Sequence, residues 1–256
     1  DCSFKVEGSG NQQVFDDTRF AALVCKDAIA DRFRYHFEQR PDVARENPDI
    51  IVQLFGSENN FQVHLNVSGE RLHKRGYRKQ PVEAPLKETL AAALLHEMQW
   101  HLKFKELCYF LDPCCGSGTL AIEALLIAAD IAPNLIRANA FEHLSFHDKL
   151  GWKAVLEEAE ARKEQGLLAL DESGLKIRAY DSNPNAVKAA QENLASLDLD
   201  AYIHIEKRAF YQISALKPSE KAEGKTQGMV VCNPPYGERL QDAGELEYLY
   251  RFLGER

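Results

Sequence analysis

Long hydrophobic runs, paired cysteines and an excess of positive charge are all missing from this sequence. No apolar run approaches the roughly 18 residues that a membrane-spanning helix needs. The six cysteines show neither a Cys-x-x-Cys pair nor a Cys/His spacing suited to zinc, so a disulfide framework and a structural zinc site are both excluded. We therefore expect a protein of the reducing cytoplasm with no membrane contact, no bound metal and no obligate protein partner.

The charge balance leaves one local place for contact with a polyanion. The net charge is −8, which does not suit binding to nucleic acid over the whole surface. Residues 71–79 nevertheless carry five basic residues, one aromatic and no acid. A solvated loop is the plain interpretation of such a run. The functional alternative is contact with RNA phosphates, weakening steeply with salt, through Arg71, Lys74, Arg75 and Arg78.

The first part of the chain has the pattern of a small α+β unit. A strand is expected at 4–7 and a helix from about residue 17, and strands at 50–55 and 61–67 flank a short polar turn. The second of these strands alternates apolar with polar residues, which predicts a sheet with one wet face. The spacing of Ala22, Ile29, Phe33 and Phe37 places these four residues on one face of the helix.

The second part alternates between strand and helix patterns. After Pro81 and Pro85, a helix is expected at 86–98, and an insertion at 133–174 carries an amphipathic helix. The alternation predicts an α/β domain with a parallel, doubly wound sheet. We expect domains at 1–80 and 81–256, the first incomplete at its start and the second at its end. The expected elements are strands 107–111, 176–180, 201–206 and 229–232, and helices 119–129 and 184–197.

A strand, a glycine loop and a helix follow one another between Tyr109 and Ala129. Asp112, Pro113, Gly116, Ser117, Gly118 and Thr119 form the loop. The glycines allow close approach of a ligand, and the helix start attracts a negative group, either phosphate or carboxylate. Asp112 repels pyrophosphate but suits an ammonium group, and neither G-x-G-x-x-G nor a P-loop lysine is present. The loop therefore favours an amino-acid-bearing cofactor over a dinucleotide.

Asp181 ends the next expected strand, in Ala-Tyr-Asp-Ser-Asn-Pro. An acidic side chain at this place can accept hydrogen bonds from both hydroxyls of a ribose. The competing interpretation is that Asp181 caps the helix that Pro184 begins. The two roles are compatible.

A second polar group stands at the mouth of the last expected strand. Asn233, Pro234, Pro235 and Tyr236 follow Met229-Val-Val-Cys. The Asn233 side-chain oxygen and the Pro234 carbonyl could accept both N–H bonds of an exocyclic amine, while Tyr236 stacks on the base ring. Methyl transfer from a sulfonium then needs mainly positioning, and no metal. A turn that only ends the strand is the structural alternative.

Together these motifs resemble the class I methyltransferases with an Asn-Pro-Pro-Tyr motif, specifically the RlmL-like RNA guanine-N2 methyltransferases that carry a THUMP domain. The resemblance implies a Rossmann-like domain that binds S-adenosylmethionine, with Glu88, Thr89 and Ser182 also at the cofactor, and methylation of guanosine N2 in 23S rRNA. It extends over Leu72-His-Lys-Arg-Gly-Tyr-Arg, Ala84-Pro-Leu-Lys-Glu-Thr-Leu-Ala-Ala-Ala, residues 112–119, Ile131-Ala-Pro, Asp181-Ser-Asn and Asn233-Pro-Pro-Tyr-Gly-Glu-Arg.

One departure and several alternatives accompany this resemblance. Ala209 stands where such enzymes usually place an acid against the adenine amine, so adenine recognition must use other groups. Methyltransferases acting on tRNA guanine N2, DNA adenine N6 or protein glutamine N5 are the competing enzymes. A non-catalytic RNA-binding scaffold is the competing function of another class.

Overall fold

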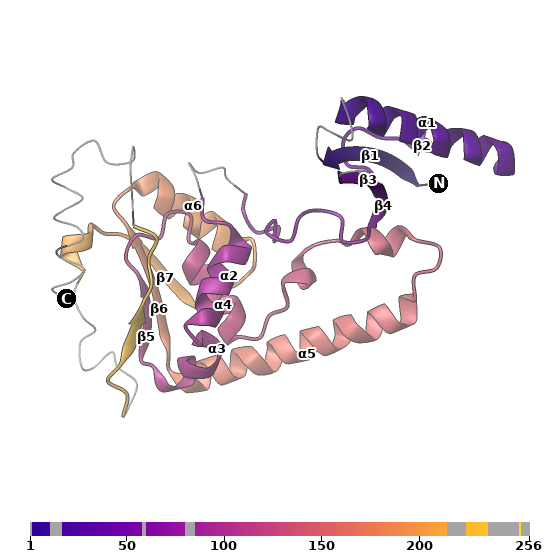
Figure 1. The fold of residues 1–256 in the computed structure, drawn as a ribbon. Coiled ribbons are helices and arrows are strands. Elements are labelled where there is room, and N and C mark those ends of the chain that lie inside the picture. Colours follow the sequence, from indigo (N-terminus) through magenta and orange to yellow (C-terminus); the bar gives the residue numbers. More distant parts are fainter. Residues whose placement is uncertain are drawn as a thin grey trace. The chain divides into compact units, whose positions relative to one another are not determined.

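The computed structural model describes residues 2–10, 17–57, 60–79, 85–213, 224–234 and 251, and the chain divides into two compact units (Figure 1). The first unit comprises residues 1–72 and 138–153, and the second comprises 73–137 and 154–256. This division differs from the expected one in two places. Most of the basic segment belongs to the second unit, and part of the insertion belongs to the first.

The first unit is built on a four-stranded sheet in the order β2-β1-β3-β4. β1 pairs in parallel with β2 and β3, and β3 pairs antiparallel with β4, which confirms the expected hairpin. β2 is too short to give a periodic signal in the sequence. The strands are β1 (Ser3–Gly10), β2 (Asp42–Val43), β3 (Ile50–Ser57) and β4 (Asn60–Asn66).

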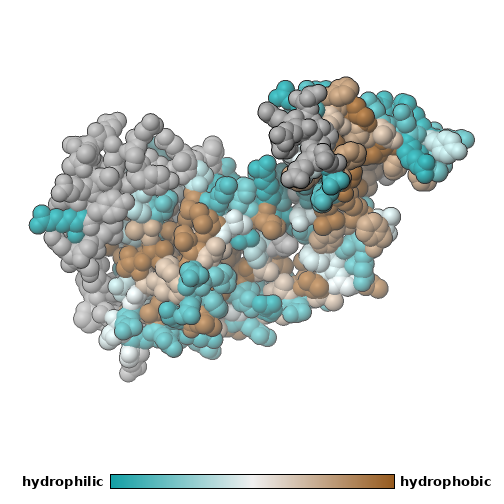
Figure 2. All heavy atoms as spheres, in the orientation of Figure 1, coloured by the Kyte–Doolittle hydropathy of each residue, from teal (hydrophilic) through white to brown (hydrophobic). Residues whose placement is uncertain are grey.

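Helix α1 (Thr18–Phe37) covers only part of this sheet, lying mainly against β1. Its one buried residue is Ala30, while Phe33 and Phe37 are exposed and stack on each other with ring centroids 5.4 Å apart. The shared face of the helix is therefore not buried at its C-terminal half. On β4 the apolar residues share one face, yet Phe61 is 68% exposed. Figure 2 shows hydrophobic residues gathered on the visible surface of this unit.

The second unit is built on a four-stranded, fully parallel sheet in the order β7-β6-β5-β8. From β5 the chain first builds outward through β6 and β7, and then returns to place β8 on the other side of β5. Such a reversal opens a crevice at the carboxyl ends of the two strands beside it. The strands are β5 (Tyr109–Asp112), β6 (Lys176–Asp181), β7 (Ile203–Lys207) and β8 (Gly228–Val230), which confirms the predicted fold class.

Two helices pack on this sheet and bury most of the core. α4 lies against β5, β6 and β7, α6 lies against β6 and β7, and α2 packs on α4. Trp100 is fully buried, and its indole N–H donates to the Ala124 carbonyl at 2.8 Å. The helices are α2 (Glu88–Glu97), α3 (Trp100–Lys103), α4 (Thr119–Ala128), α5 (Lys149–Ser173) and α6 (Pro184–Ala195), with short 3-10 turns at 104–106, 133–136, 140–143 and 210–212.

Helix α5 begins in the first unit and ends in the second. Its N-terminal part carries Trp152, which meets Phe141 edge to face at 4.9 Å between ring centroids. Its C-terminal part buries Leu170 in the core of the second unit. Within the described residues no helix has the length and apolar character needed to cross a membrane.

Helix α5 passes so close to the end of α4 that a larger residue at Gly166 should destabilise the protein. A Cβ added to Gly166 would overlap the Ala129 carbonyl oxygen and carbon, which are backbone atoms. Replacing a helical glycine by alanine normally gains roughly 1 kcal/mol of helix propensity. Overpacking costs about 1–3 kcal/mol, and the backbone here cannot rotate away. We therefore expect Gly166→Ala to lower the melting temperature, measured by circular dichroism.

Gln165→Ala is the control for this change, since the neighbouring Gln165 is exposed on the same helix. It should leave the melting temperature almost unchanged. An unchanged or higher melting temperature for Gly166→Ala would show that the two helices do not approach so closely.

Candidate active site at the carboxyl edge of the second sheet

The glycine loop connects β5 to α4 at the carboxyl edge of the sheet. Gly116 and Gly118 have φ values of +53° and +82°, which other residues rarely adopt. A Cβ at Gly116 would meet nothing within 4 Å, whereas one at Gly118 would lie 3.1 Å from the Ala190 Cβ on α6. Gly116 thus keeps an open approach for a ligand, while Gly118 permits close packing of the loop against a helix.

Asp181, at the end of β6, is bonded to this loop. Its Oδ2 accepts from the Gly116 N–H at 2.9 Å, and its Oδ1 accepts from the Asn183 N–H at 2.9 Å. Asn183, rather than Asp181, caps α6, through acceptance from the Asn185 N–H. The competing capping interpretation of Asp181 was therefore wrong. Its carboxylate lies beside the open Gly116, and Ser182 next to it is exposed.

Asp112 ends β5 as a buried carboxyl group, only 1% exposed. Burial, together with the negative charge of Asp181, raises its pKa to about 8, although its Oδ1 accepts from the Cys114 N–H. An isolated carboxylate in such a place is unfavourable unless a cation or a proton accompanies it. The group is therefore suited to a ligand that brings a positive charge.

Three cysteines surround this carboxyl group, and none is a reactive thiol. Burial raises the pKa of Cys114 to about 12 and that of Cys232 to about 11, and it raises the pKa of Cys115 well above its usual value. A nucleophilic cysteine needs a lowered pKa. The raised values favour a packing role.

Asn233 and Pro234 follow β8 at the same edge of the sheet. β8 runs parallel to β5 with Leu111 opposite Val230, and the Val231 N–H donates to the Leu111 carbonyl at 2.9 Å. This register places Asn233 beyond the carboxyl end of β8, which is the strand next to β5, the strand that Asp112 ends. Both Asn233 and Pro234 are half-buried. Pro235 and Tyr236 lie outside the described residues, so their stacking and positioning roles stay predictions.

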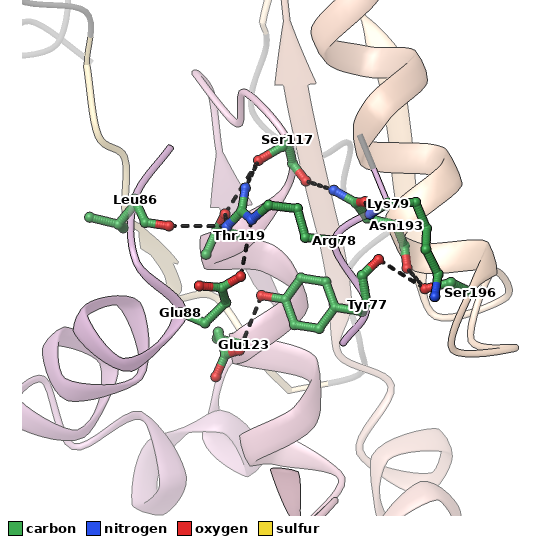
Figure 3. Close-up of polar contacts among 10 residues, drawn as sticks. All are labelled: Tyr77, Arg78, Lys79, Leu86, Glu88, Ser117, Thr119, Glu123, Asn193 and Ser196. Carbon is green, nitrogen blue, oxygen red and sulfur yellow. Dashed lines mark hydrogen bonds and ion pairs between the residues drawn. The ribbon is translucent and has the colours of Figure 1, made fainter. Parts of the chain in front are cut away.

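The basic segment contributes to this site instead of forming a solvated loop. We call residues 75–79 the strap. Tyr77 is 1% exposed, its hydroxyl donates to Glu123 Oε1 on α4 at 3.1 Å, and its carbonyl accepts from the Ser196 hydroxyl (Figure 3). Arg75 pairs with the same Glu123 at 3.4 Å. Burial raises the pKa of Glu123, while these two partners oppose that shift.

Arg78 extends its guanidinium toward the glycine loop and the start of α2 (Figure 3). It pairs with Glu88 at 3.0 Å and donates to the hydroxyls of Ser117 and Thr119 at 2.6 and 3.0 Å. The expected phosphate contact of Arg78, like that of Arg75, therefore competes with protein carboxylates. Arg71 and Lys74 also have polar or electrostatic partners within the protein.

Three buried residues around the loop were not predicted from the sequence: Tyr77, Glu123 and Asn193. Asn193 is fully buried on α6, where its Oδ1 accepts from the Lys79 N–H at 2.9 Å and its Nδ2 donates to the Ser117 carbonyl at 3.0 Å. A signal for Glu123 existed, since it is the one charge in the apolar helix Thr-Leu-Ala-Ile-Glu-Ala-Leu-Leu-Ile-Ala. An unpaired carboxylate is rarely buried, so a cationic partner was to be expected.

The remaining expected positions are placed as follows. Pro113 is buried in the loop, and Thr89 is half-buried in the first turn of α2, next to Glu88. Ala209 follows β7, and its N–H donates to the Gln212 side chain at 3.1 Å. Across the described ranges, no group of three or more His, Cys, Asp or Glu residues is arranged to hold a metal ion.

Two family models match the chain. A THUMP domain matches residues 1–66, and the model described as RMKL-like, methyltransferase domain matches residues 75–256, more than half of the chain. A relative from Allochromatium vinosum named ribosomal RNA large subunit methyltransferase K/L is 42% identical over 255 residues. The alignment covers 99% of this chain and 33% of that protein, so the chain spans about one third of the length of this relative.

Solved structures are also similar over nearly the whole chain. The SMU.472 protein, named as a methyltransferase and crystallised with SAH, has a TM-score of 0.80 at 28% identity, covering 99% of this chain and 63% of that one. A Listeria monocytogenes protein named as a predicted N6-adenine-specific DNA methylase has a TM-score of 0.76 at 30% identity, covering 99% and 62%. The predicted resemblance is confirmed: the chain belongs to the RMKL-like methyltransferase family and carries a THUMP domain before the methyltransferase domain.

Proposed function

We propose that this chain transfers a methyl group from S-adenosylmethionine to the exocyclic N2 amine of a guanosine in 23S rRNA. The observation that carries the proposal is the meeting of two motifs at one sheet edge. The glycine loop with Asp112 and Asp181 follows β5 and β6, and Asn233-Pro234 follows the adjacent β8. A methyl donor held by the first motif would lie beside an amine held by the second.

The charges around the loop support S-adenosylmethionine as the cofactor. Its methionyl end carries an ammonium and a carboxylate, which fit Asp112 and the N-terminus of α4 respectively. Asp181 can accept the ribose hydroxyls beside the open face of Gly116. The SAH found with the SMU.472 protein is the product form of the same cofactor. The expected contacts of Glu88, Thr89, Pro113 and Ser182 belong to this proposal.

The acceptor half of the reaction follows from hydrogen-bond geometry. A base amine is a poor nucleophile because its lone pair is conjugated with the ring. Acceptance of both N–H bonds by the Asn233 side-chain oxygen and the Pro234 carbonyl would direct that lone pair at the sulfonium methyl. The C–S bond breaks as the C–N bond forms, SAH leaves, and the amine loses one proton to solvent. The base reaches the site only when flipped or unstacked, with Tyr236 proposed to stack on it.

RNA as the substrate class is supported by the THUMP domain and by the relatives named as large-subunit rRNA methyltransferases. Phosphate contacts by Arg71, Lys74, Arg75 and Arg78 would position the RNA without choosing the base. Of these, Arg75 and Arg78 bind carboxylates of the protein, so a phosphate would compete with Glu123 and Glu88 for them.

The proposal is tested by tritium transfer from labelled S-adenosylmethionine to unmethylated 23S rRNA, followed by nucleoside analysis. We expect label in N2-methylguanosine. Parallel reactions with tRNA, duplex DNA and protein distinguish the competing methyltransferases. Label only in one of those substrates would overturn the 23S assignment. Cofactor binding without transfer to any of them would favour the RNA-binding scaffold.

Asn233→Ala separates catalysis from cofactor binding. We expect turnover to fall by roughly 100-fold or more, because the acceptor amine loses its position. The dissociation constant for SAH, measured by calorimetry, should change less than about twofold, since the amide is proposed to contact the acceptor only. Asn185→Ala, at an exposed amide on α6, is the matched control and should leave both quantities unchanged. A parallel loss of SAH affinity in Asn233→Ala would contradict the assignment.

The raised pKa of Asp112, about 8, predicts how cofactor affinity depends on pH. Below pH 8 the carboxyl group is mostly protonated in the free protein, while pairing with the ammonium group requires the carboxylate. Binding therefore releases a proton, and affinity should rise by up to about tenfold per pH unit from pH 6 to pH 8. Calorimetry of SAH at pH 7 in two buffers with different ionisation enthalpies measures that proton directly.

Asp112→Asn is the control for the pH experiment. It removes the titrating group, so its SAH affinity should be flat between pH 6 and pH 8 and weaker than that of the unmodified protein at pH 8. Equal heats in the two buffers would mean that Asp112 is not the partner of the ammonium group.

A further inference from the structure

Four polar contacts of the second unit meet at Arg78, a residue that takes no part in the methyl transfer itself. Its guanidinium has five N–H donors. Four of them go to acceptors among the described residues: Glu88 Oε1, the Leu86 carbonyl, Ser117 Oγ and Thr119 Oγ1. Two of these acceptors belong to the segment that begins α2, and the other two belong to the glycine loop and the first turn of α4. Arg78 therefore joins three segments that are distant in the sequence.

Ser117, one of the four partners of Arg78, is also bound by Asn193. Arg78 holds the Ser117 hydroxyl, while Asn193 on α6 holds the Ser117 carbonyl and, with its other amide atom, the backbone of the strap at Lys79. Ser117 and Thr119 are both almost fully buried. The end of the glycine loop is thus fixed by side chains that lie in the strap and in α6, and its conformation depends on the docking of the strap.

Opposite charges stand at the two ends of this loop. The buried Asp112 precedes it, and the Arg78 guanidinium is bonded to its last residues and to the start of α4. The methionyl end of S-adenosylmethionine carries the complementary pair, an ammonium and a carboxylate. The adenosyl end has no such pair and is proposed to meet Asp181 instead. The strap therefore lies at the amino-acid end of the pocket.

We propose that Arg78 is a positioning residue for the cofactor, which holds Ser117, Thr119 and the start of α4 in the arrangement that receives the methionyl carboxylate. This inference rests on the proposed use of S-adenosylmethionine. It gives Arg78 a role in cofactor selection in place of the phosphate contact expected from the sequence, and it makes the strap part of the cofactor site.

The test compares two ligands that differ only at the amino-acid end. SAH carries the full amino-acid part, whereas 5′-methylthioadenosine lacks it, and calorimetry gives both dissociation constants. We expect Arg78→Gln to weaken SAH binding by about 10- to 100-fold, because the displaced Ser117, Thr119 and start of α4 would lose one or two hydrogen bonds to the methionyl carboxylate. The affinity for methylthioadenosine should change less than about threefold, so the ratio of the two affinities falls. Arg78→Lys keeps the charge without the planar fork and should give an intermediate ratio.

Lys79→Gln is the matched control, since Lys79 lies on the same strap but its exposed side chain donates to the Gly76 carbonyl, within the strap itself. Its melting temperature and its affinity ratio should both remain those of the unmodified protein.

The outcomes are distinguishable. If Arg78→Gln weakens both ligands by the same factor, or neither, the inference is overturned while the proposed cofactor stands. If the unmodified protein binds neither ligand, the proposed function fails, and this inference fails with it. A loss confined to SAH supports the inference, even when the variant also melts at a lower temperature.

Discussion

The parallel pairing of β5 with both β6 and β8 decides where the polar groups that follow these strands lie. Parallel strands bring their carboxyl ends to one edge, so Asp112, Asp181 and Asn233 meet there although they are far apart in the sequence. The order of the strands matters as much as their direction. Because β8 returns to the far side of β5, the loop after β5 stands between the proposed cofactor side chain of β6 and the proposed acceptor site of β8.

Buried ionisable groups determine which ligand this edge of the sheet can bind. Asp112 is a carboxyl group with no cationic partner among the described residues, whereas Glu88 and Glu123 are carboxylates paired with arginines of the strap. Buried ion pairs contribute little net stability compared with apolar packing, yet breaking one is costly. The two pairs therefore act mainly by specifying how the strap docks. The uncompensated carboxyl group is the one suited to a cationic ligand.

The strap belongs to the second unit by its contacts, although it comes directly after the first unit in the sequence. Its side chains fasten the glycine loop, α2 and α4 of the second unit. A segment such as residues 71–79, with five basic residues in nine, is usually assigned to solvent or to phosphate. Here the acids that pair with the strap lie on helices, Glu88 ten residues from Arg78 and Glu123 48 residues from Arg75, and the local composition of the strap carries no information about them.

The parallel sheet, the glycine loop and the family could all be predicted from the sequence, because each depends on local periodicity or on a short run of residues. The alternation of apolar and polar residues in β4 also indicated which side chains share a face. That this apolar face stays exposed could be seen only in the folded protein, since covering it requires a second layer. In the same way, Asn193, the burial of Asp112 and the partners of Arg78 follow from the approach of distant segments. The physical reason is that a charge selects its partner by distance and desolvation in three dimensions, and neither quantity is encoded in its neighbours along the chain.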